Sequence, residues 1–288
     1  YDYNEIPLTL CSKDITAYDH KEALKDLLRC HHLPHAEGAG FTDPEQACAY
    51  GEQLGFPLIV KPNHGSLTVH TTFPIHDRVA LREAIRIGQL FEPEIIVERF
   101  VTGTLYRATV IGREHVFVCE RQTAHVIGDG SSTIAALIEA KNAHPKRKPA
   151  QVKNTTSHLI PIGEVLERFL SEQGQALTSI PEVGTKVLLS SKCTLATGSD
   201  LISRTTDTHP ENKELFLQLA QILETDVVGM DFIIPSIRQS HRETTAAILE
   251  INTLPYVDLH EEPLYGPPDP VAKIGWDVVC KRLGVTTI

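Results

Sequence analysis

A short apolar segment near the carboxyl end of the chain, ILEIN, carries an acid and an amide where a buried strand normally carries hydrocarbon. Side chains alternate between the two faces of a strand, so Glu250 and Asn252 are expected on one face together with Ile248. The other two apolar side chains, Leu249 and Ile251, are expected on the opposite face. Because a buried carboxylate without a partner is costly, we expect a cation beside Glu250.

A second apolar segment, VVGMDFII, precedes this one and is joined to it by a short polar turn. Two such strands are expected to pair in an antiparallel sheet, which would place Asp231 across from Glu250 and Asn252. Two carboxylates and an amide oxygen are hard ligands, the set that Mg²⁺ uses in nucleotide sites, whereas Zn²⁺ and Cu²⁺ prefer softer ligands. The alternative is that both acids form ion pairs with nearby lysines or arginines.

Two further segments could bind parts of a nucleotide. The segment FPLIVKPNHGS reads as a buried strand that brings Lys61 to the start of a loop containing Gly65. An ammonium group beside free backbone N–H groups suits a phosphate, although a solvated lysine at a strand end is the structural alternative. The segment EIIVERFVTG ends in residues whose backbone groups could meet a purine edge: Glu98, Arg99, Phe100 and Val101.

The composition excludes several classes of protein. Of the 288 residues, 41% are hydrophobic and 22% are charged, and the length suggests about two domains. The net charge is -10 and the basic residues are dispersed apart from the run KRK, which argues against a nucleic-acid partner. No apolar run approaches the ~18 to 20 residues of a membrane span, which argues against a membrane partner.

The cysteines and histidines do not suggest a zinc site. The six cysteines lie far apart without a C-x-x-C pair, which favours reduced thiols in a cytoplasmic protein. The histidines of HHLPH, residues 31–35, lack a Cys or HExxH partner, so we expect a solvated turn there. The chain starts at Tyr1 without a leader, so we expect it to be part of a longer polypeptide.

The elements that would position these residues form an α+β pattern. Strands and helices alternate over residues 31–104, which predicts a small α/β lobe. From residue 105 onward, paired β-segments joined at Gly112 and flanking helices predict a larger antiparallel-sheet lobe, and either Ser131 or Ser132 could cap the helix that follows. The expected helices cover residues 18–30, 43–55, 78–88, 131–144, 162–174 and 210–224, and the expected strands cover 57–62, 94–100, 106–112, 115–122, 185–191, 227–234 and 246–252.

Taken together and in this order, these features resemble the ATP-grasp superfamily. Within it, the chain is similar to the ATP-grasp part of cyanophycin synthetases and, more distantly, to bifunctional glutathione synthetases. The most specific pieces are ERQTAHVIGDGSSTIAALIEAKNAHPKR and LERFLSEQGQALTSIPEVGTKVLL, followed by HPEN and GMDFII with ILEIN. The resemblance covers most of the chain.

The resemblance implies an ATP-grasp fold in which ATP lies between a small lid lobe, residues 31–104, and a large lobe, residues 105–288, with residues 1–30 packed on the large lobe. It assigns Lys21 and Lys61 to phosphate binding, Glu98 to Val101 to the adenine hinge, and Asp231, Glu250 and Asn252 to Mg²⁺. Residues near the acceptor substrate would be Arg107, His125, Gly128, Asp129, Gly130 and His260. For His125 and His260 a structural role is the alternative, and the two glycines are also expected in a tight turn.

The implied reaction is ATP-dependent ligation of a carboxylate to an amine through an acylphosphate, with amino acids or short peptides as substrates and ATP and Mg²⁺ as cofactors. Self-association is common among relatives of this fold. Departures from the family pattern concern the shorter loop after Lys61, Leu105 in place of an acid, and Ser190, Thr194 and Thr206, although Lys192 could restore a positive charge. The alternatives are a degenerate module that binds nucleotide or peptide without turnover, and a ligase like glutathione synthetase.

Overall fold

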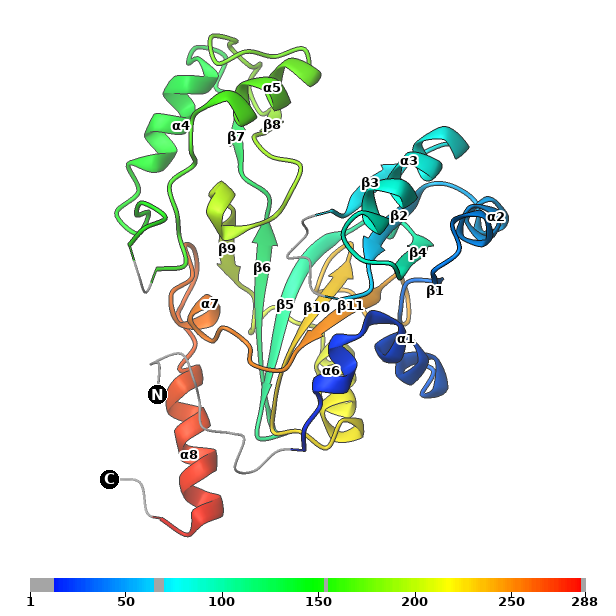
Figure 1. The fold of residues 1–288 in the computed structure, drawn as a ribbon. Coiled ribbons are helices and arrows are strands. Elements are labelled where there is room, and N and C mark those ends of the chain that lie inside the picture. The colour runs from blue at the N-terminus through cyan, green and yellow to red at the C-terminus, as the bar shows by residue number, and fades with distance from the viewer. Residues whose placement is uncertain (1–12, 65–69, 153–154, 286–288) are drawn as a thin grey trace.

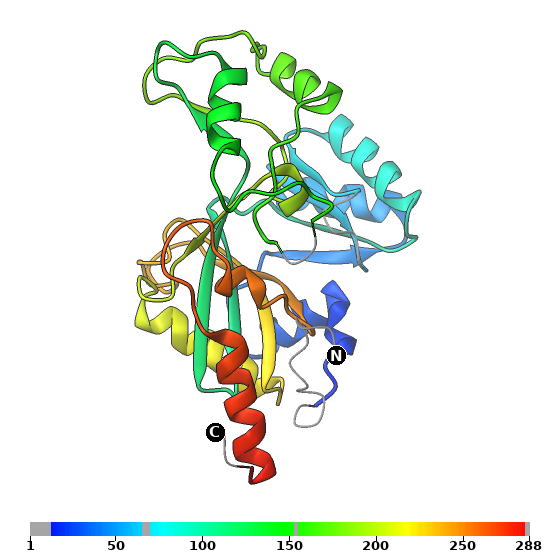
Figure 2. The same ribbon diagram turned by 90° about the vertical axis from the view of Figure 1, so that its left-hand side faces the viewer.

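A computed structural model describes residues 13–64, 70–152 and 155–285 (Figure 1). Three groups of elements are visible: a central sheet, a small lobe beside it, and a third lobe above it. In both Figure 1 and Figure 2 the small lobe and the third lobe lie toward the same end of the central sheet, and helix α8 extends from the other end. The mixed helices and antiparallel sheets agree with the predicted α+β class.

The small lobe is an antiparallel four-stranded sheet in the order β1-β4-β2-β3, with two helices that share its apolar core. Asp43 caps helix α2 by accepting hydrogen bonds from the backbone N–H groups of Glu45 and Gln46, and Gly55 ends the helix with a φ of 84°. Both ends were predicted. The elements are β1 (Gly38–Phe41), α2 (Pro44–Leu54), β2 (Leu58–Pro62), β3 (Thr72–Ile75), α3 (Arg78–Gln89) and β4 (Ile95–Arg99).

The central sheet has five antiparallel strands in the order β11-β10-β5-β6-β9. Its members are β5 (Thr104–Ile111), β6 (His115–Gln122), β9 (Asp200–Ser203), β10 (Val227–Ile234) and β11 (Ala247–Asn252). The predicted hairpin turns at Gly112, whose φ of 65° favours glycine. One face of this sheet packs its largest apolar core against α1 (Lys21–Cys30) and α6 (Pro210–Ile222), so the other face is left for the site.

Helix α8 (Val271–Leu283) packs against the end of the sheet through Val271 and Val279. A short helix, α7 (Asp258–Glu261), lies between β11 and α8 in the sequence, and two short 3₁₀ helices, η2 (Thr16–Asp19) and η3 (Leu195–Thr197), complete the described elements. No helix in the described ranges is long and apolar enough to cross a membrane.

The third lobe, residues 124–189, has an apolar core of its own. It contains β7 (His125–Ile127), α4 (Ile134–Asn142), α5 (Glu164–Glu172) and β8 (Lys186–Leu188), and β7 pairs only with β8. The sequence did not separate this lobe from the rest of residues 105–288. The expected caps Ser131 and Ser132 were wrong, because Thr133 caps α4 by accepting a hydrogen bond from the N–H of Ala136.

Strand β11, which carries Glu250 and Asn252, contains a β-bulge. Asp231 pairs with Glu250 but Phe232 pairs with Ile248, so Leu249 is the extra residue. Ile248 and Ile251 therefore both pack in the main apolar core. The expectation that Ile248 shares a face with Glu250 was wrong, because the bulge breaks the strict alternation of side chains.

Candidate active site

The predicted antiparallel pairing of β10 with β11 is confirmed. Asp231 lies directly opposite Glu250. Asn252 lies opposite Gly229, two residues further along the same pair of strands. Directly opposed residues share a face of the sheet, so the two carboxylates point the same way. They lie on the face that the main apolar core does not use.

Two arginines bind the carboxylate of Asp231. The Nε of Arg107 on β5 lies 2.6 Å from one oxygen, and the Nη1 of Arg121 on β6 lies 3.1 Å from the other. All three side chains are at most 15% exposed. Burial opposes ionisation of Asp231, but the two guanidinium groups outweigh it and hold its pKa below the usual value. The ion-pair alternative is therefore realised for Asp231.

Glu250 behaves differently from Asp231. Burial and the neighbouring Asp231 both raise the pKa of Glu250, and the two carboxyl groups share a hydrogen bond. Two carboxylates this close favour one shared proton, held by Glu250. The Nδ2 of Asn252 is buried without a hydrogen-bond partner among the described residues, which leaves its amide group available to a ligand.

These donors suit a hard divalent cation. Asp231 and Glu250 offer carboxylate oxygens and Asn252 offers an amide oxygen, and such oxygens are the ligand set of Mg²⁺. In the part of the chain that the structure describes, no cluster holds three or more His, Cys, Asp or Glu side chains placed to bind a metal. A cation on this face would therefore need additional oxygen ligands from a bound molecule.

A second charged cluster lies in the small lobe, around Glu98 on β4. Glu98 is 2% exposed and accepts a hydrogen bond from the Nζ of Lys61 on β2 at 2.5 Å. It also forms an ion pair with Lys25 on α1, whose Nζ donates to the carbonyl of Ala36 at 2.7 Å. Burial opposes ionisation of Glu98, but Lys61 and Lys25 together hold its pKa below the usual value.

Lys21 stands at the start of α1 and connects it to the small lobe. Its Nζ donates to the carbonyl of Asn63 at 3.2 Å, and burial lowers its pKa. The carboxylate of Glu250 raises the pKa of Lys21. The ammonium group of Lys61 in turn lowers the pKa of Glu250. The lysine cluster and the carboxylate pair therefore face the same space.

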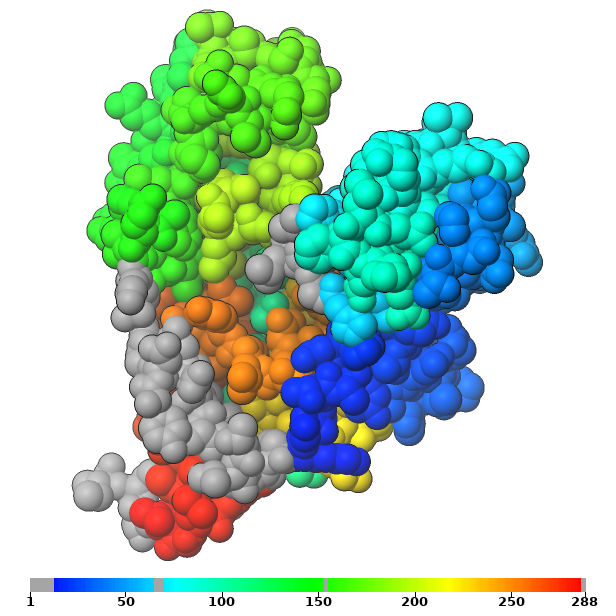
Figure 3. All heavy atoms as spheres, viewed as in Figure 1, coloured from blue at the N-terminus to red at the C-terminus, as the bar shows by residue number. Residues whose placement is uncertain are grey.

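Figure 3 shows a groove between the third lobe, in green, and the small lobe, in cyan. Both predicted phosphate lysines, Lys21 and Lys61, lie within electrostatic range of Glu250. The other two predicted metal ligands, Asp231 and Asn252, belong to the same strand pair as Glu250. Gly65, predicted to bind phosphate, lies outside the described residues.

The predicted adenine hinge lies at the end of β4. The N–H of Arg99 donates to the carbonyl of Glu37, and the N–H of Phe100 donates to the carbonyl of Pro57. Both N–H groups are therefore engaged inside the small lobe. Arg99 itself is exposed and pairs with Glu37 at 3.3 Å, and the ring of Phe100 stacks on Phe73. Val101 follows outside the strand and is half-buried.

The predicted substrate residues of the third lobe lie around β7. His125 is buried, its Nδ1 bonds the carbonyl of Thr123 at 2.8 Å, and burial lowers its pKa. Asp129 is exposed, and its carboxylate accepts hydrogen bonds from the backbone of Ser131 and Ser132, which lower its pKa. These bonds hold the turn before α4.

The two glycines of this turn have structural reasons to be glycine. A Cβ on Gly128 would lie 2.2 Å from the carbonyl oxygen of Glu182, and Gly130 has a φ of 75°. This agrees with the tight-turn alternative. A substrate contact by either residue stays a prediction.

The remaining predicted residues have different surroundings. His260 is 1% exposed, its Nε2 bonds the hydroxyl of Thr109 at 2.8 Å, and burial lowers its pKa to about 3. It is therefore a neutral ring buried on the same face of the sheet as Arg107, because Thr109 and Arg107 are two residues apart on β5. Lys192 lies on the loop before β9, where its N–H donates to the hydroxyl of Ser190 at 3.1 Å.

Sequence reasoning missed Lys25 and Arg121. Lys25 follows Lys21 by one helical turn, which places both on one side of α1. Arg121 lies two positions after Cys119, the residue that pairs with Arg107, so it shares the face of Arg107. Both spacings were visible, but nothing in the sequence indicated that these two positions would be buried.

Geometrically, the site can hold an anion with the lysines and a divalent cation with the acids.

Solved structures of similar proteins identify the class of the fold. The chain is similar to a solved bifunctional glutathione synthetase from Pasteurella multocida, with a TM-score of 0.70 and 26% identity over 94% of this chain and 37% of that one. The ATP-grasp ligase PsnB, solved with Mg and ADP, shares the fold, with a TM-score of 0.53 and 14% identity over 92% of this chain and 59% of that one. The fold is that of an ATP-grasp protein.

Curated relatives agree with this class. Cyanophycin synthetase of Trichormus variabilis is 33% identical over 262 residues, which make up 90% of this chain and 29% of the relative. The glutathione biosynthesis bifunctional protein of Clostridium perfringens is 32% identical over 265 residues, or 90% of this chain and 34% of the relative. No protein-family model matches the chain. The chain belongs to the ATP-grasp superfamily, and it spans about a third of the length of the curated relatives it matches.

Proposed function

We propose that the chain is an ATP-dependent carboxylate-amine ligase that joins amino acids or short peptides through an acylphosphate. The observation that carries the proposal is the opposed pair Asp231 and Glu250, with Lys21 of α1 and Lys61 of the small lobe within electrostatic range of Glu250. Mg²⁺ bound with ATP would neutralise the phosphate oxygens as the substrate carboxylate attacks. The curated relatives named as synthetases support this reaction class.

The basic side chains of the site would bind the phosphates and the acidic side chains would bind Mg²⁺. Lys21 and Lys61 would hold the phosphates, while Glu250 and Asn252 would hold Mg²⁺ together with Asp231. Arg107, now bound to Asp231, would be free to meet an anionic substrate group when Asp231 turns to the cation. The lobes on both sides of the groove would keep water from the reactive acylphosphate.

The experiment is a phosphate-release screen over pairs of amino acids and dipeptides, with ATP and Mg²⁺. Aspartyl peptides with arginine or lysine form the first arm, and γ-glutamylcysteine with glycine forms the second. We expect release only with a matched carboxylate and amine, and its loss in Glu250→Gln. Nucleotide or peptide binding without release in any arm would favour the alternative, a binding module without turnover.

The proposal extends to the setting of the protein. The five cysteines that the structure describes are free thiols, which supports the cytoplasm as its location. The length of the curated relatives supports a longer polypeptide in which this chain is one part. Self-association is proposed from the relatives of the fold alone.

A further inference from the structure

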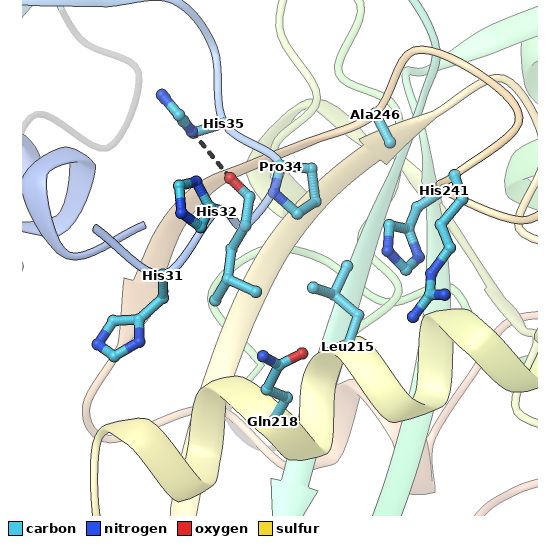
Figure 4. A pocket seen from close by; sticks show the side chains of 10 residues that line it. His31, His32, Pro34, His35, Leu215, Gln218, His241 and Ala246 are labelled. Atoms are coloured by element: carbon cyan, nitrogen blue, oxygen red, sulfur yellow. Dashed lines mark hydrogen bonds between the residues drawn. The ribbon is translucent and has the colours of Figure 1, made fainter. Parts of the chain in front are cut away.

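A cavity of about 540 Å³ lies away from the groove, at the carboxyl end of α1 (Figure 4). We call it the histidine pocket, and its lining combines the α1–β1 connection, α6 and the turn before β11. Its floor is apolar, formed by Leu33, Pro34, Leu215 and Ala246. Leu33 and Leu215 belong to the core on the face of the sheet that Glu250 does not use, so the pocket is separate from the candidate active site.

The polar lining of the pocket is basic. Four histidines and one arginine line it, with Gln218 and without any acidic side chain: His31, His32, His35, His241 and Arg242. Such a collection is unusual on a chain with a net charge of -10. In Figure 4 His31, His32 and His35 lie on one side and His241 on the other, so a ligand on the apolar floor would lie between them.

The ring of His241 is fixed with one nitrogen turned inward. The amide of Asn212 donates to the carbonyls of Ile237 and Gln239, so its oxygen is the acceptor. That oxygen accepts from the N–H of His241 at 2.9 Å and from its ring Nδ1 at 3.2 Å. The Nδ1 of His35 likewise donates to the carbonyl of Leu33 at 2.8 Å. These hydrogen bonds fix the orientation of both rings.

Arg242 supplies a permanent positive charge at the same place. Its side chain is 67% exposed, and its nearest carboxylate oxygen, on Glu211, is 3.9 Å away. Glu211 itself accepts a hydrogen bond from the hydroxyl of Ser240. A guanidinium group with its donors turned to solvent matches the planar oxygens of a carboxylate or a phosphate.

We propose that the histidine pocket binds a small organic anion that carries carboxylate or phosphate groups, with Arg242 as its main anchor and the histidines as further hydrogen-bonding groups. The apolar floor would carry the body of the ligand. The pocket is also bonded to the metal strand, since the N–H of Ile248 donates to the carbonyl of Pro34 at 2.9 Å. A ligand here would therefore contact Pro34, whose carbonyl is bonded to a residue two positions from Glu250.

Binding should strengthen as the pH falls. Burial, and then the charge of Arg242, lower the pKa of His241, so this ring is neutral near pH 7 and gains a donor only in more acidic solution. The other groups that face it are His209 before α6, which also lowers its pKa, and Glu211 and Glu214 on α6, which raise it.

The test is isothermal titration of the full chain with citrate and, separately, with pyrophosphate, at about pH 6 and about pH 8. We expect Arg242→Gln to weaken binding at least about tenfold. The matched control is Arg238→Gln, an exposed arginine on the same turn that does not line the pocket and pairs with Asp207 at 2.7 Å. Lys61→Met tests whether the anion enters the groove instead.

The outcomes separate cleanly. Loss of binding in Arg242→Gln with retention in Arg238→Gln and Lys61→Met, and tighter binding at the lower pH, supports the proposal. Binding of only one probe supports it and identifies the carboxylate or the phosphate as the recognised group. Binding by neither probe, or binding that is lost in Lys61→Met but kept in Arg242→Gln, overturns it. None of these results depends on ligase activity.

Discussion

At the scale of single residues, three positively charged groups compete for the carboxylate of Asp231. They are Arg107, Arg121 and the divalent cation that Asp231 and Glu250 could bind. In the structure the two guanidinium groups occupy both of its oxygens. Mg²⁺ bound here would compete with these guanidinium groups and with the proton on Glu250. Metal affinity is therefore set by arginines as much as by acids.

This competition predicts the effect of Arg121→Met. Removing one guanidinium group frees an oxygen of Asp231 and removes a positive charge near the cation, so Mn²⁺ used as a probe should bind roughly tenfold more tightly, about 1.4 kcal/mol. Electron paramagnetic resonance of Mn²⁺ at about pH 8, where proton competition is weak, measures it. Arg113→Met, which alters the ion pair with Asp226, is the control. Unchanged or weaker binding in Arg121→Met would mean that Arg121 supports the metal site.

His260 makes the stability of the fold depend on pH. Burial lowers its pKa to about 3, whereas an unfolded histidine titrates near ~6.5. Between these values the unfolded chain binds a proton that the native chain does not, so the contribution is complete above ~6.5 and declines as the pH falls toward 3, by about 1.4 kcal/mol per pH unit. Denaturant unfolding at several pH values should show a shallower dependence in His260→Gln, while His115→Gln, at an exposed position, should keep the wild-type dependence.

The site residues that the sequence revealed are those on strands with a clear pattern. Asp231 and Glu250 could be paired because both interrupt long apolar strands. Arg121 and Lys25 could not, because an arginine in a strand and a lysine on an amphipathic helix are normally solvent-facing. Their burial is a property of the assembled lobes, and a single sequence does not contain it.

At the scale of elements, helices α1 to α6 and the long strands were predicted, whereas α7, α8 and most of the short strands were not. The short strands β1, β3, β7, β8 and β9 have three or four residues each, too few for a period to be recognised, and only β8 was anticipated, within a longer segment. The bulge at Leu249 was also hidden, because the inserted residue is apolar like its neighbours. A bulge beside a candidate metal ligand re-aims that side chain, which gives the irregularity a use.

The third lobe should behave as a separate element of stability. Its core shares no residue with that of the central sheet, and Leu170 at its centre is fully buried. We expect Leu170→Ala to cost about 2 to 5 kcal/mol within this lobe and to speed hydrogen exchange over residues 124–189 without changing exchange in β10 and β11. Val165→Ala, on the same helix but 76% exposed, is the control. Faster exchange throughout the central sheet would contradict the independence of the lobe.

At the scale of the whole molecule, helix α1 joins the small lobe to the central sheet. Its apolar side packs Leu24 and Leu28 into the core of the central sheet. Its lysines reach the small lobe, where Lys25 pairs with Glu98 and Lys21 bonds Asn63. The helix is therefore positioned to set how far the small lobe stands from the carboxylate pair.

Lys25→Met tests this role of α1. The change leaves the buried carboxylate of Glu98 with Lys61 as its one remaining lysine among the described residues, so we expect a loss of about 3 kcal/mol, the low end for breaking a buried pair. Arg29→Met breaks an exposed pair with Asp26 on the same helix and should cost less than about 1 kcal/mol. Thermal unfolding measures both changes. Small-angle scattering should show a wider separation of the small lobe from the central sheet in Lys25→Met alone, because a salt bridge between α1 and β4 is lost there. An unchanged scattering curve would mean that the apolar contacts of α1 suffice to hold the small lobe in place.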